Sequence, residues 1–478
     1  MGERPVLGLI VGNRGGFPQA PVAEGRRLLL DRLEGMGIDV IVLEEGASHL
    51  GAVETWQDAQ ACARLFREQA TRIDGILISL PNFGDEQGVA DSIRLSGLQV
   101  PLLVHAFPDT VGSMGFEARR DSFCGKISVC NNLTQYGYPF SLTEAHTLDP
   151  AGAVFEAEIR RFVAACRVVR GMRGARLGVV GTRPNAFKTV RFSEKLLEAS
   201  GVSVSVIDLS DVLGRVERLA MSDARVGQKL EEIRSYVTVG NAPEEPLVRM
   251  SRLSVVLGDW MEQNGLRGAA IQCWDSMQHN FGFSACTVMS MMTNNLLPAA
   301  CEADATGLVA MYALQLASGQ ASTLADWNNN FGDDPDKCVF FHCGYWAKSF
   351  VPELEFGKHA SPALVDSWGT LHGQAAAGPI SFARVTTDDR RGEVRAYVGE
   401  GRMTADPLDT YGTRAVIEIP GLPRLLRHIC RSGFEHHVAM NPGLVADAVE
   451  DAFATYLGWP TYHHDGAGLA GRSAGSVR

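Results

Sequence analysis

The chain has 478 residues, 45% of them hydrophobic, and its 44 Lys and Arg residues against 55 Asp and Glu residues leave a formal charge of −11. This length and composition predict a globular protein of about three domains with large cores. The acidic balance and the lack of a Lys- or Arg-rich run exclude a nucleic acid or an anionic membrane as the expected partner.

The N-terminus shows no cleavage pattern of a secretory signal, and no stretch of about 18 apolar residues occurs, which predicts a cytoplasmic protein. The ten cysteines form no CxxC pair. We therefore expect reduced, mostly buried thiols. Cys301 directly precedes Glu302, but no local signature of a nucleophile surrounds it, so we interpret it as a packing residue.

The first 170 residues alternate between strand and helix patterns. Short apolar runs rich in β-branched residues indicate strands, and amphipathic spacing indicates helices between the first three of them. The predicted strands are 5–11, 39–44, 75–80 and 100–106, and the predicted helices are 23–37 and 58–72. This alternation predicts a parallel sheet covered by helices.

The same pattern restarts after a helical connector at 155–174. Strand-like runs at 176–181, 203–210 and 268–274 flank a helical pattern at 192–201. We therefore expect a second α/β unit that begins near residue 171.

The texture changes beyond residue 345 to short alternating strands separated by Gly, Pro and Asp, at 380–387, 393–401 and 413–419. The predicted fold class is thus α/β, with two N-terminal Rossmann-like α/β domains followed by a mostly β, barrel-like C-terminal domain. The predicted domain bounds are 1–170, 171–318 and 319–478.

A dinucleotide is not expected, because the turns "GLIVGNRGGF" and "GVVGTRPNAF" contain neither GxGxxG nor GxxxxGK[ST]. Their glycines fit tight strand-to-helix turns. Arg14 and Arg183 follow the first strand of each α/β unit. The carboxyl ends of such strands are where open α/β sheets bind ligands.

The stretch "PAACEADATGLVAMYALQLASGQASTLADWNNN" begins at Pro298 and contains the candidate chemistry. We predict that Pro298 begins a buried helix with Glu302 in its first turn, where a carboxylate is electrostatically favourable on its own account. Asp326 follows a predicted strand at 322–325. The helix and the strand could bring the two carboxylates together at one end of the unit. Such a pair can bind a hard divalent cation and transfer protons.

Histidines could complete such a site. His342 stands in an apolar strand, where a core role is an equal alternative, and His436 and His437 open another predicted strand. Adjacent residues of a strand face opposite sides, so only one of this pair is expected to reach a given metal. Imidazole with carboxylates suits Mn, Co, Fe or Zn.

The segment "CEADATGLVAMYALQLASGQASTLADW" is similar to the metal-site segment of the L-fucose isomerase and L-arabinose isomerase superfamily, and the resemblance extends over the whole chain. It implies that Glu302 and Asp326 bind the metal and transfer the proton, with His436 as the third ligand. The implied cofactor is Mn²⁺ or another divalent ion such as Co²⁺.

The strand "GAAIQCW" resembles the one whose Gln lies in the fucose-isomerase pocket, which implies that Gln272 contacts the substrate. His342 falls near an additional metal-binding His of the arabinose isomerases. The arabinose enzymes carry Glu where Asp326 stands, so the resemblance supports the superfamily more than either sugar.

The segment 112–141 is polar, Gly-rich and aromatic. In this superfamily a neighbouring subunit's N-terminal domain closes over the site, which implies that Arg119, Arg120 and Asn131 contact the substrate as a lid. Arg14 is a separate candidate for substrate contact because of its place at the end of a strand. An ordered loop that caps its own domain is an equal alternative. Arginines would suit a sulfonate or phosphate on the sugar, and sulfosugar isomerases occur among these relatives.

Two functions follow as hypotheses. The first is an aldose–ketose isomerase that acts on a 6-deoxy, pentose or sulfonated aldose through an enediol, assembled as a homo-oligomer and by resemblance a hexamer. The alternative is a non-catalytic sugar-binding or regulatory α/β protein. The metal content of the purified protein discriminates between the two.

Overall fold

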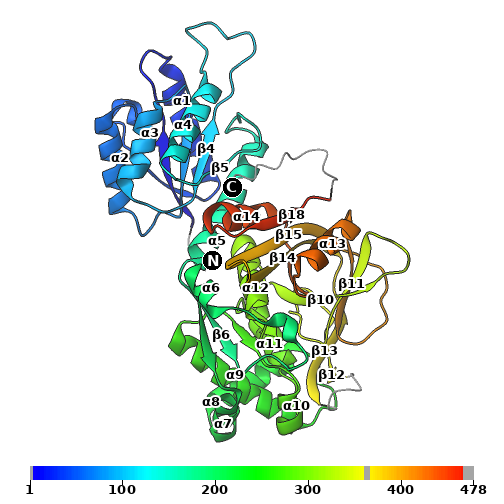
Figure 1. The fold of residues 1–478 in the computed structure, drawn as a ribbon. Helices are drawn as coiled ribbons and strands as arrows, with labels where there is room; N and C mark the ends of the chain where they lie inside the picture. Colours follow the sequence, from blue (N-terminus) through cyan, green and yellow to red (C-terminus); the bar gives the residue numbers. More distant parts are fainter. Residues whose placement is uncertain (1–3, 360–366, 467–478) are drawn as a thin grey trace. The chain divides into compact units, whose positions relative to one another are not determined.

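The computed structural model describes residues 4–359 and 367–466. The chain divides into two compact units, residues 1–170 with 451–458 and residues 171–450 with 459–478 (Figure 1). Within the described ranges, no helix combines the length and the apolar character that crossing a membrane requires. The predicted boundary near residue 171 coincides with the division between the units, and the predicted three-domain division stays a prediction.

The first unit is a parallel sheet of order β2-β1-β3-β4-β5 with helices on its faces. Its apolar strands fill two cores, one on each face of the sheet. The elements are β1 Val6–Val11, α1 Ala20–Gly35, β2 Asp39–Val42, α2 Trp56–Glu68, β3 Gly75–Leu80, α3 Glu86–Ser96, β4 Leu102–Ala106, α4 Ser122–Gln135, β5 Ser141–Leu142 and the connector α5 Ala153–Met172. The four predicted strands of this region are confirmed.

The second unit begins with a smaller parallel sheet of order β7-β6-β8-β9. Its elements are β6 Ala175–Val180, α6 Glu194–Ala199, β7 Val202–Ile207, α7 Leu209–Arg218, α8 Ala224–Tyr236, α9 Glu244–Asn264, β8 Ala269–Ile271, α10 Ser276–Phe281, α11 Cys286–Asn294, β9 Ala299–Cys301 and α12 Ala305–Ser318. The chain therefore forms two parallel α/β sheets, as the alternating patterns predict.

A nine-stranded mixed sheet follows in the same unit. Its order is β12-β13-β16-β11-β10-β17-β14-β15-β18, and an additional pairing of β15 with β16 closes six of these strands into a ring. The elements are β10 Thr323–Asn330, β11 Lys337–His342, β12 Glu355–Lys358, β13 Trp368–Gln374, β14 Gly378–Asp388, β15 Glu393–Met403, β16 Thr413–Glu418, α13 Leu422–Ser432, β17 His437–Asn441, α14 Ala446–Glu450 and β18 Thr461–His464.

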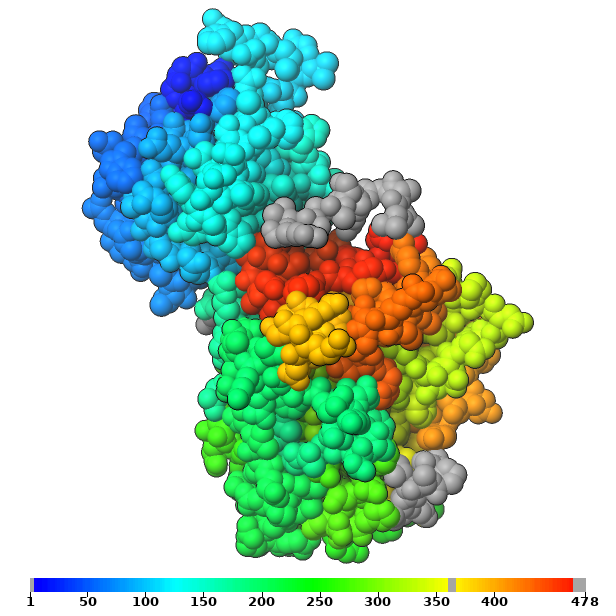
Figure 2. Space-filling view, in the orientation of Figure 1, coloured from blue at the N-terminus to red at the C-terminus, as the bar shows by residue number. Residues whose placement is uncertain are grey.

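Helix α12 joins the two sheets of the second unit. It is buried along almost its whole length and contacts β14 and β17 of the mixed sheet as well as β6, β8 and β9 of the parallel sheet. In the space-filling view of Figure 2 the green and orange parts of this unit form one continuous surface. The ends of the two sheets can therefore contribute side chains to one site.

Two local predictions around this helix are wrong. Pro298 does not begin a helix, because residues Ala299–Cys301 pair with β8 as a strand and the helix begins only at Ala305. The strand predicted at 322–325 does not stop before Asp326, since β10 continues to Asn330 through pairing with β11. In both cases pairing with a distant strand outweighs the local signals of the sequence.

Candidate functional site

Glu302 lies in the short link between β9 and α12. Its backbone φ is 58° and that of Ala303 is 55°, in the left-handed region that residues other than glycine rarely adopt. The residue is 4% exposed, and its side-chain Oε1 accepts a hydrogen bond of 2.8 Å from Trp274 Nε1. Backbone strain of this kind gathers at functional sites, where the surrounding fold holds it in place.

His437, the first residue of β17, faces this carboxylate. Its ring is fully buried, with Nε2 at 2.9 Å from Glu302 Oε2 and Nδ1 hydrogen-bonded to Asp304 Oδ2 at 2.8 Å. Asp304 is the N-cap of α12 and accepts the Gly307 N–H at 2.9 Å. A carboxylate on Nδ1 places the proton of a neutral imidazole there, so the lone pair of Nε2 points toward Glu302.

Arg384 on β14 balances the charge of Asp304. Both residues are fully buried, and the guanidinium binds both oxygens of the Asp304 carboxylate while its Nε donates to Glu435 Oε2 at 3.0 Å. Such a bidentate, charge-assisted pair is among the stronger and most directional contacts in proteins. The network holds Asp304, and through it the ring of His437, in one orientation.

Asp326 approaches His437 from β10, where the two residues are direct partners across the strands. Its Oδ1 lies 3.5 Å from Nε2 of His437 and also 3.5 Å from Nε2 of His436. The expectation that the two rings face opposite sides is wrong, because β17 begins at His437 and His436 precedes the regular strand. Only His437 lies close to Glu302 as well.

His342 ends β11 on the other side of Glu302, with its Nε2 at 3.9 Å from Glu302 Oε2. Glu302 Oε2, His342 Nε2 and His437 Nε2 are buried, lie within 4.8 Å of one another, and make no hydrogen bond to any residue that the structure describes. Buried polar atoms without partners are rare in folded proteins. These three atoms lie close together and can serve as ligands of a cation.

The pKa values of the two carboxylates shift in opposite directions. Burial raises the pKa of Glu302, but the neighbouring His437 and His342 outweigh burial and lower it below the ordinary value. Burial raises the pKa of Asp326, and the negative charge of Glu302 raises it further. Carboxylates whose environments separate their pKa values in this way are typical of acid–base pairs.

The two histidines also differ. Burial alone would lower the pKa of His437, but the Asp304 carboxylate on Nδ1 and the Glu302 carboxylate 2.9 Å from Nε2 raise the pKa well above the ordinary value. Burial and the neighbouring His437 lower the pKa of His436 to about 4. His437 is thus the imidazole that the carboxylates hold, whereas the His436 side chain is 39% exposed at the edge of the site.

A loop after β6 borders the site. Its Phe187 packs against Trp274, with ring centroids 5.2 Å apart, and against His436 at 5.4 Å. Arg183 of this loop lines a pocket of about 610 Å³ together with Gln272 and Trp274. Trp274 is therefore shared between this pocket and the carboxylate centre, where it binds Glu302.

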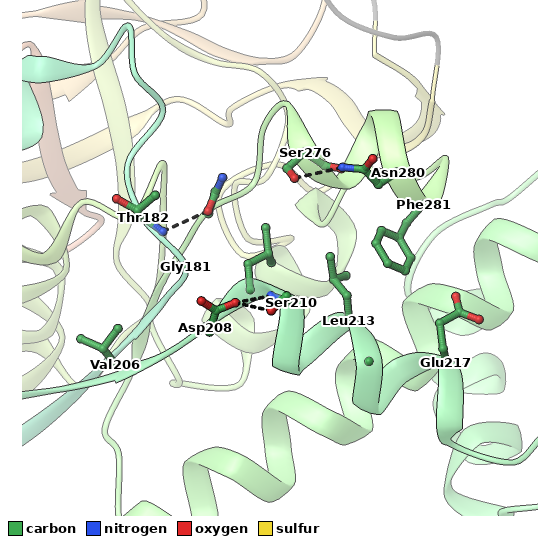
Figure 3. A pocket seen from close by; sticks show the side chains of 13 residues that line it. Gly181, Thr182, Val206, Asp208, Ser210, Leu213, Glu217, Ser276, Asn280 and Phe281 are labelled. Carbon is green, nitrogen blue, oxygen red and sulfur yellow. Dashed lines mark hydrogen bonds between the residues drawn. The ribbon is translucent and has the colours of Figure 1, made fainter.

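Gln272 follows β8 and lines both this pocket and a second one of about 730 Å³. Its Oε1 accepts the Thr182 N–H at 3.0 Å (Figure 3). The second pocket is lined by Asp208, whose carboxylate is already bound to Ser210, and by Phe281. Both pockets lie at the carboxyl ends of parallel strands, where α/β sheets bind ligands.

The other predicted substrate residues belong to the first unit. Arg14 pairs with Glu86 at 2.9 Å, and Arg119 pairs with Asp121 at 2.9 Å. The Arg120 guanidinium donates to Pro81 O at 2.9 Å, and Asn131 is exposed on α4. Their contribution to the site stays a prediction.

Sequence reasoning missed several residues of this centre. Trp274, Phe187 and Arg384 were not singled out, and Asp304 was given no role. The only local signal was the acidic pair Glu302 and Asp304 with one residue between them. Arg384 reads as an ordinary residue of an alternating strand, because its partner Asp304 lies 80 positions away.

Two family models match the chain. The model described as the N-terminal domain of fucose/sulfoquinovose isomerase matches residues 8–173, and the model described as the C-terminal domain of L-fucose isomerase matches residues 340–464. The second match includes His342, Arg384 and His437.

Curated relatives agree with these matches. A sulfoquinovose isomerase of Priestia aryabhattai is 24% identical over 383 residues, which cover 79% of this chain and 83% of the relative. A sulfoquinovose isomerase of Alkalicoccus urumqiensis is 22% identical over 373 residues, with coverages of 77% and 81%. A periplasmic solute-binding protein from Actinobacillus succinogenes 130z with bound D-allose covers 67% of this chain and 85% of its own, but at 9% identity and a TM-score of 0.16.

Proposed function

The chain belongs to the fucose isomerase-like family of aldose–ketose isomerases, and we propose that it converts a sulfonated aldose into the corresponding ketose. Two of the similar relatives are sulfoquinovose isomerases, which supports a sugar that bears a sulfonate. Family membership favours an enzyme over the non-catalytic sugar-binding protein considered from the sequence.

One observation above all supports catalysis in the second unit. Glu302 Oε2 and Asp326 Oδ1 both lie beside His437 Nε2, at 2.9 Å and 3.5 Å, and Trp274, which binds Glu302, lines the pocket with Gln272. Two carboxylates and an imidazole within one small volume provide both metal ligands and proton carriers.

We propose that Glu302, Asp326 and His437 bind the divalent ion, with Mn²⁺ or Co²⁺ as the expected metals. His437 replaces His436 in this assignment, because only its ring has the carboxylate partner on the second nitrogen that metal-binding histidines usually have. When bound, the ion supplies Lewis-acid polarisation of neighbouring sugar oxygens.

The residues of the chain carry the proton transfers in this proposal. One carboxylate of the pair removes the proton from C2 of the open-chain aldose, and the other moves a proton between O1 and O2 before the C2 proton returns at C1. Trp274 binds Oε1 of Glu302, which leaves Oε2 without a hydrogen bond to any described residue and available to the metal and the substrate. The resulting intermediate is an enediol.

The sulfonate would lie at the far end of the pocket from the carboxylates. Arg183 lines that pocket and is partly exposed, and a guanidinium binds sulfonate oxygens through paired hydrogen bonds. The test is a panel of aldoses, 6-deoxyaldoses and sulfonated aldoses incubated with the enzyme and Mn²⁺. Ketose formation from neutral aldoses alone would contradict a sulfonated substrate while leaving the isomerase class intact.

We further propose a homohexamer in which the first unit of one copy covers the site of another. The loop before α4 exposes large apolar side chains, with Val111 at 98%, Phe116 at 72% and Met114 at 56% exposure, although a free surface rarely gathers such residues. Light scattering should give six chains per particle. A fully active monomer would refute the shared site.

The enediol route is tested by turnover in heavy water. Proton transfer through a carboxylate that exchanges with solvent should place deuterium at C1 of the ketose. Product free of deuterium after extensive turnover would indicate a hydride shift instead.

A further inference from the structure

Four of the ten cysteines meet directly behind Glu302. Cys273 follows β8, Cys301 ends β9, Cys343 follows β11 and Cys286 begins α11. Cys273, Cys286 and Cys301 are buried, and Cys343 is partly buried. The ends of three strands from two different sheets thus bring their thiols together, whereas the sequence separates them by up to 70 residues.

These thiols form a chain of contacts. The donor atoms of Cys273, Cys301 and Glu302 lie within 4.8 Å of one another, as do those of Cys301, His342 and Cys343, and Cys286 lies beside Cys343. The chain ends at an imidazole, because Cys343 Sγ lies 3.4 Å from Nδ1 of His342. Packing alone does not require polarisable sulfur atoms around a ring nitrogen.

We propose that Cys301, Cys343 and Nδ1 of His342 bind a thiophilic cation of the Zn²⁺ class, in a site that borders the carboxylate centre at His342. A ring nitrogen of His342 and the two Sγ atoms lie within 4.8 Å of one another, and Cys343 Sγ is 3.4 Å from Nδ1. A tetrahedral zinc ion with Zn–S bonds of about 2.3 Å places two sulfur ligands on the order of 3.8 Å apart, so small shifts of the side chains suffice.

The chemistry of the donors separates the two sites. Thiolates prefer soft and borderline ions, whereas carboxylates prefer hard ones such as Mn²⁺. Binding replaces the bond in which Nδ1 of His342 accepts the Cys343 N–H at 3.0 Å, and each thiol releases its proton to the buffer. The partial exposure of Cys343 provides the entry path for the ion.

The position of this site has a consequence for catalysis. His342 presents Nδ1 to the thiols and Nε2 to Glu302, and Cys301 is the residue before Glu302. An ion on the thiols therefore acts on both neighbours of the catalytic carboxylate. We expect the ion on the thiols to weaken Mn²⁺ binding at the carboxylates. Thiophilic metals should therefore inhibit the enzyme through the thiol cluster.

The test uses the full chain with its exposed thiols removed by Cys124→Ser and Cys430→Ser, stripped of metal and kept reduced by a phosphine. Cd²⁺ is added without substrate, and the ultraviolet charge-transfer band of the cadmium–thiolate bond is recorded. We expect the band to saturate at one ion per chain. In a variant that carries Cys301→Ser or Cys343→Ser as a further substitution, the band should be absent.

Two controls make this result specific. Cys338→Ser removes another buried thiol, on β11, and should leave the band unchanged. Glu302→Gln with Asp326→Asn disables the carboxylate centre and should also leave it unchanged, so the result does not depend on isomerase activity. A missing band in the starting protein, a band that survives both cysteine variants, or a band lost with the carboxylates would overturn the proposal.

A second measurement covers the case in which Cys301→Ser fails to fold. X-ray absorption of the starting protein loaded with one equivalent of Zn²⁺ should show sulfur neighbours at about 2.3 Å. A shell made only of nitrogen and oxygen would place the zinc at the carboxylates and overturn the proposal.

Discussion

Replacing Asp304 with Asn tests the buried network that orients His437. Asparagine keeps the size of the side chain and an oxygen that can cap Gly307, but it removes the charge that faces Arg384. Both charged residues are fully buried, so water cannot compensate for the loss. His437 at the same time loses the carboxylate on Nδ1.

The magnitude follows from burial. Removing one partner of a buried ion pair costs roughly 3–5 kcal/mol, and here Glu435 still offsets part of the Arg384 charge, so we expect the lower end. Loss of the carboxylate behind a metal-binding histidine typically costs 10–100-fold in metal affinity or activity. Asp304→Asn should therefore lower both the free energy of unfolding and Mn²⁺ affinity.

The matched control is Asp85→Asn. Asp85 is the N-cap of α3 and accepts the Gly88 N–H at 2.8 Å, as Asp304 does for Gly307, but it has no ion pair among the described residues. Since Asn is as good a cap as Asp, we expect no more than about 0.5 kcal/mol of change.

Urea unfolding followed by far-ultraviolet circular dichroism suits this comparison, because helices of both units contribute to the signal. Calorimetric titration with Mn²⁺ gives the affinity. An Asp304→Asn protein that binds Mn²⁺ as tightly as the parent would refute the role of Asp304 in positioning His437.

Three further predictions concern single histidines and Trp274. His437→Asn should abolish Mn²⁺ binding in calorimetry while His436→Asn retains most of it, and the reverse order would restore His436 as the ligand. Trp274→Phe should lower kcat more than Mn²⁺ affinity, because it frees Oε1 of Glu302 without removing a ligand; equal losses would contradict this. Burial lowers the pKa of His105 from 6.5 to about 4. The folded protein favours the neutral ring, so the contribution of His105 to the free energy of unfolding is fully present above pH 6.5. It is lost as the pH falls from 6.5 to 4, which amounts to about 3 kcal/mol at 1.36 kcal/mol per pKa unit. His105→Asn should flatten the urea midpoint across this range, and an unchanged slope would contradict the assignment.

Much of the fold follows from local patterns. The strands at 6–11 and 75–80 are continuous apolar runs, as strands buried on both faces require, and amphipathic helices separate them. The closure of the mixed sheet is not local, since it depends on β15 pairing with both β14 and β16. The helix predicted at Pro298 shows the limit: pairing with β8 determined the structure of 299–301.

The sequence by itself predicted the groups of the candidate site, namely the carboxylates Glu302 and Asp326 and a pair of adjacent histidines. The tertiary structure alone decided which imidazole the carboxylates hold. His437 opens β17 as the partner of Asp326, and Asp304 reaches its second nitrogen from a helix 133 positions earlier. The same holds for Arg384 and for the four thiols behind Glu302. Their contacts join segments that are distant in the sequence, through two sheets that both pack against α12. Hydrophobic periodicity predicts which residues are buried, but it does not predict which buried residues contact one another.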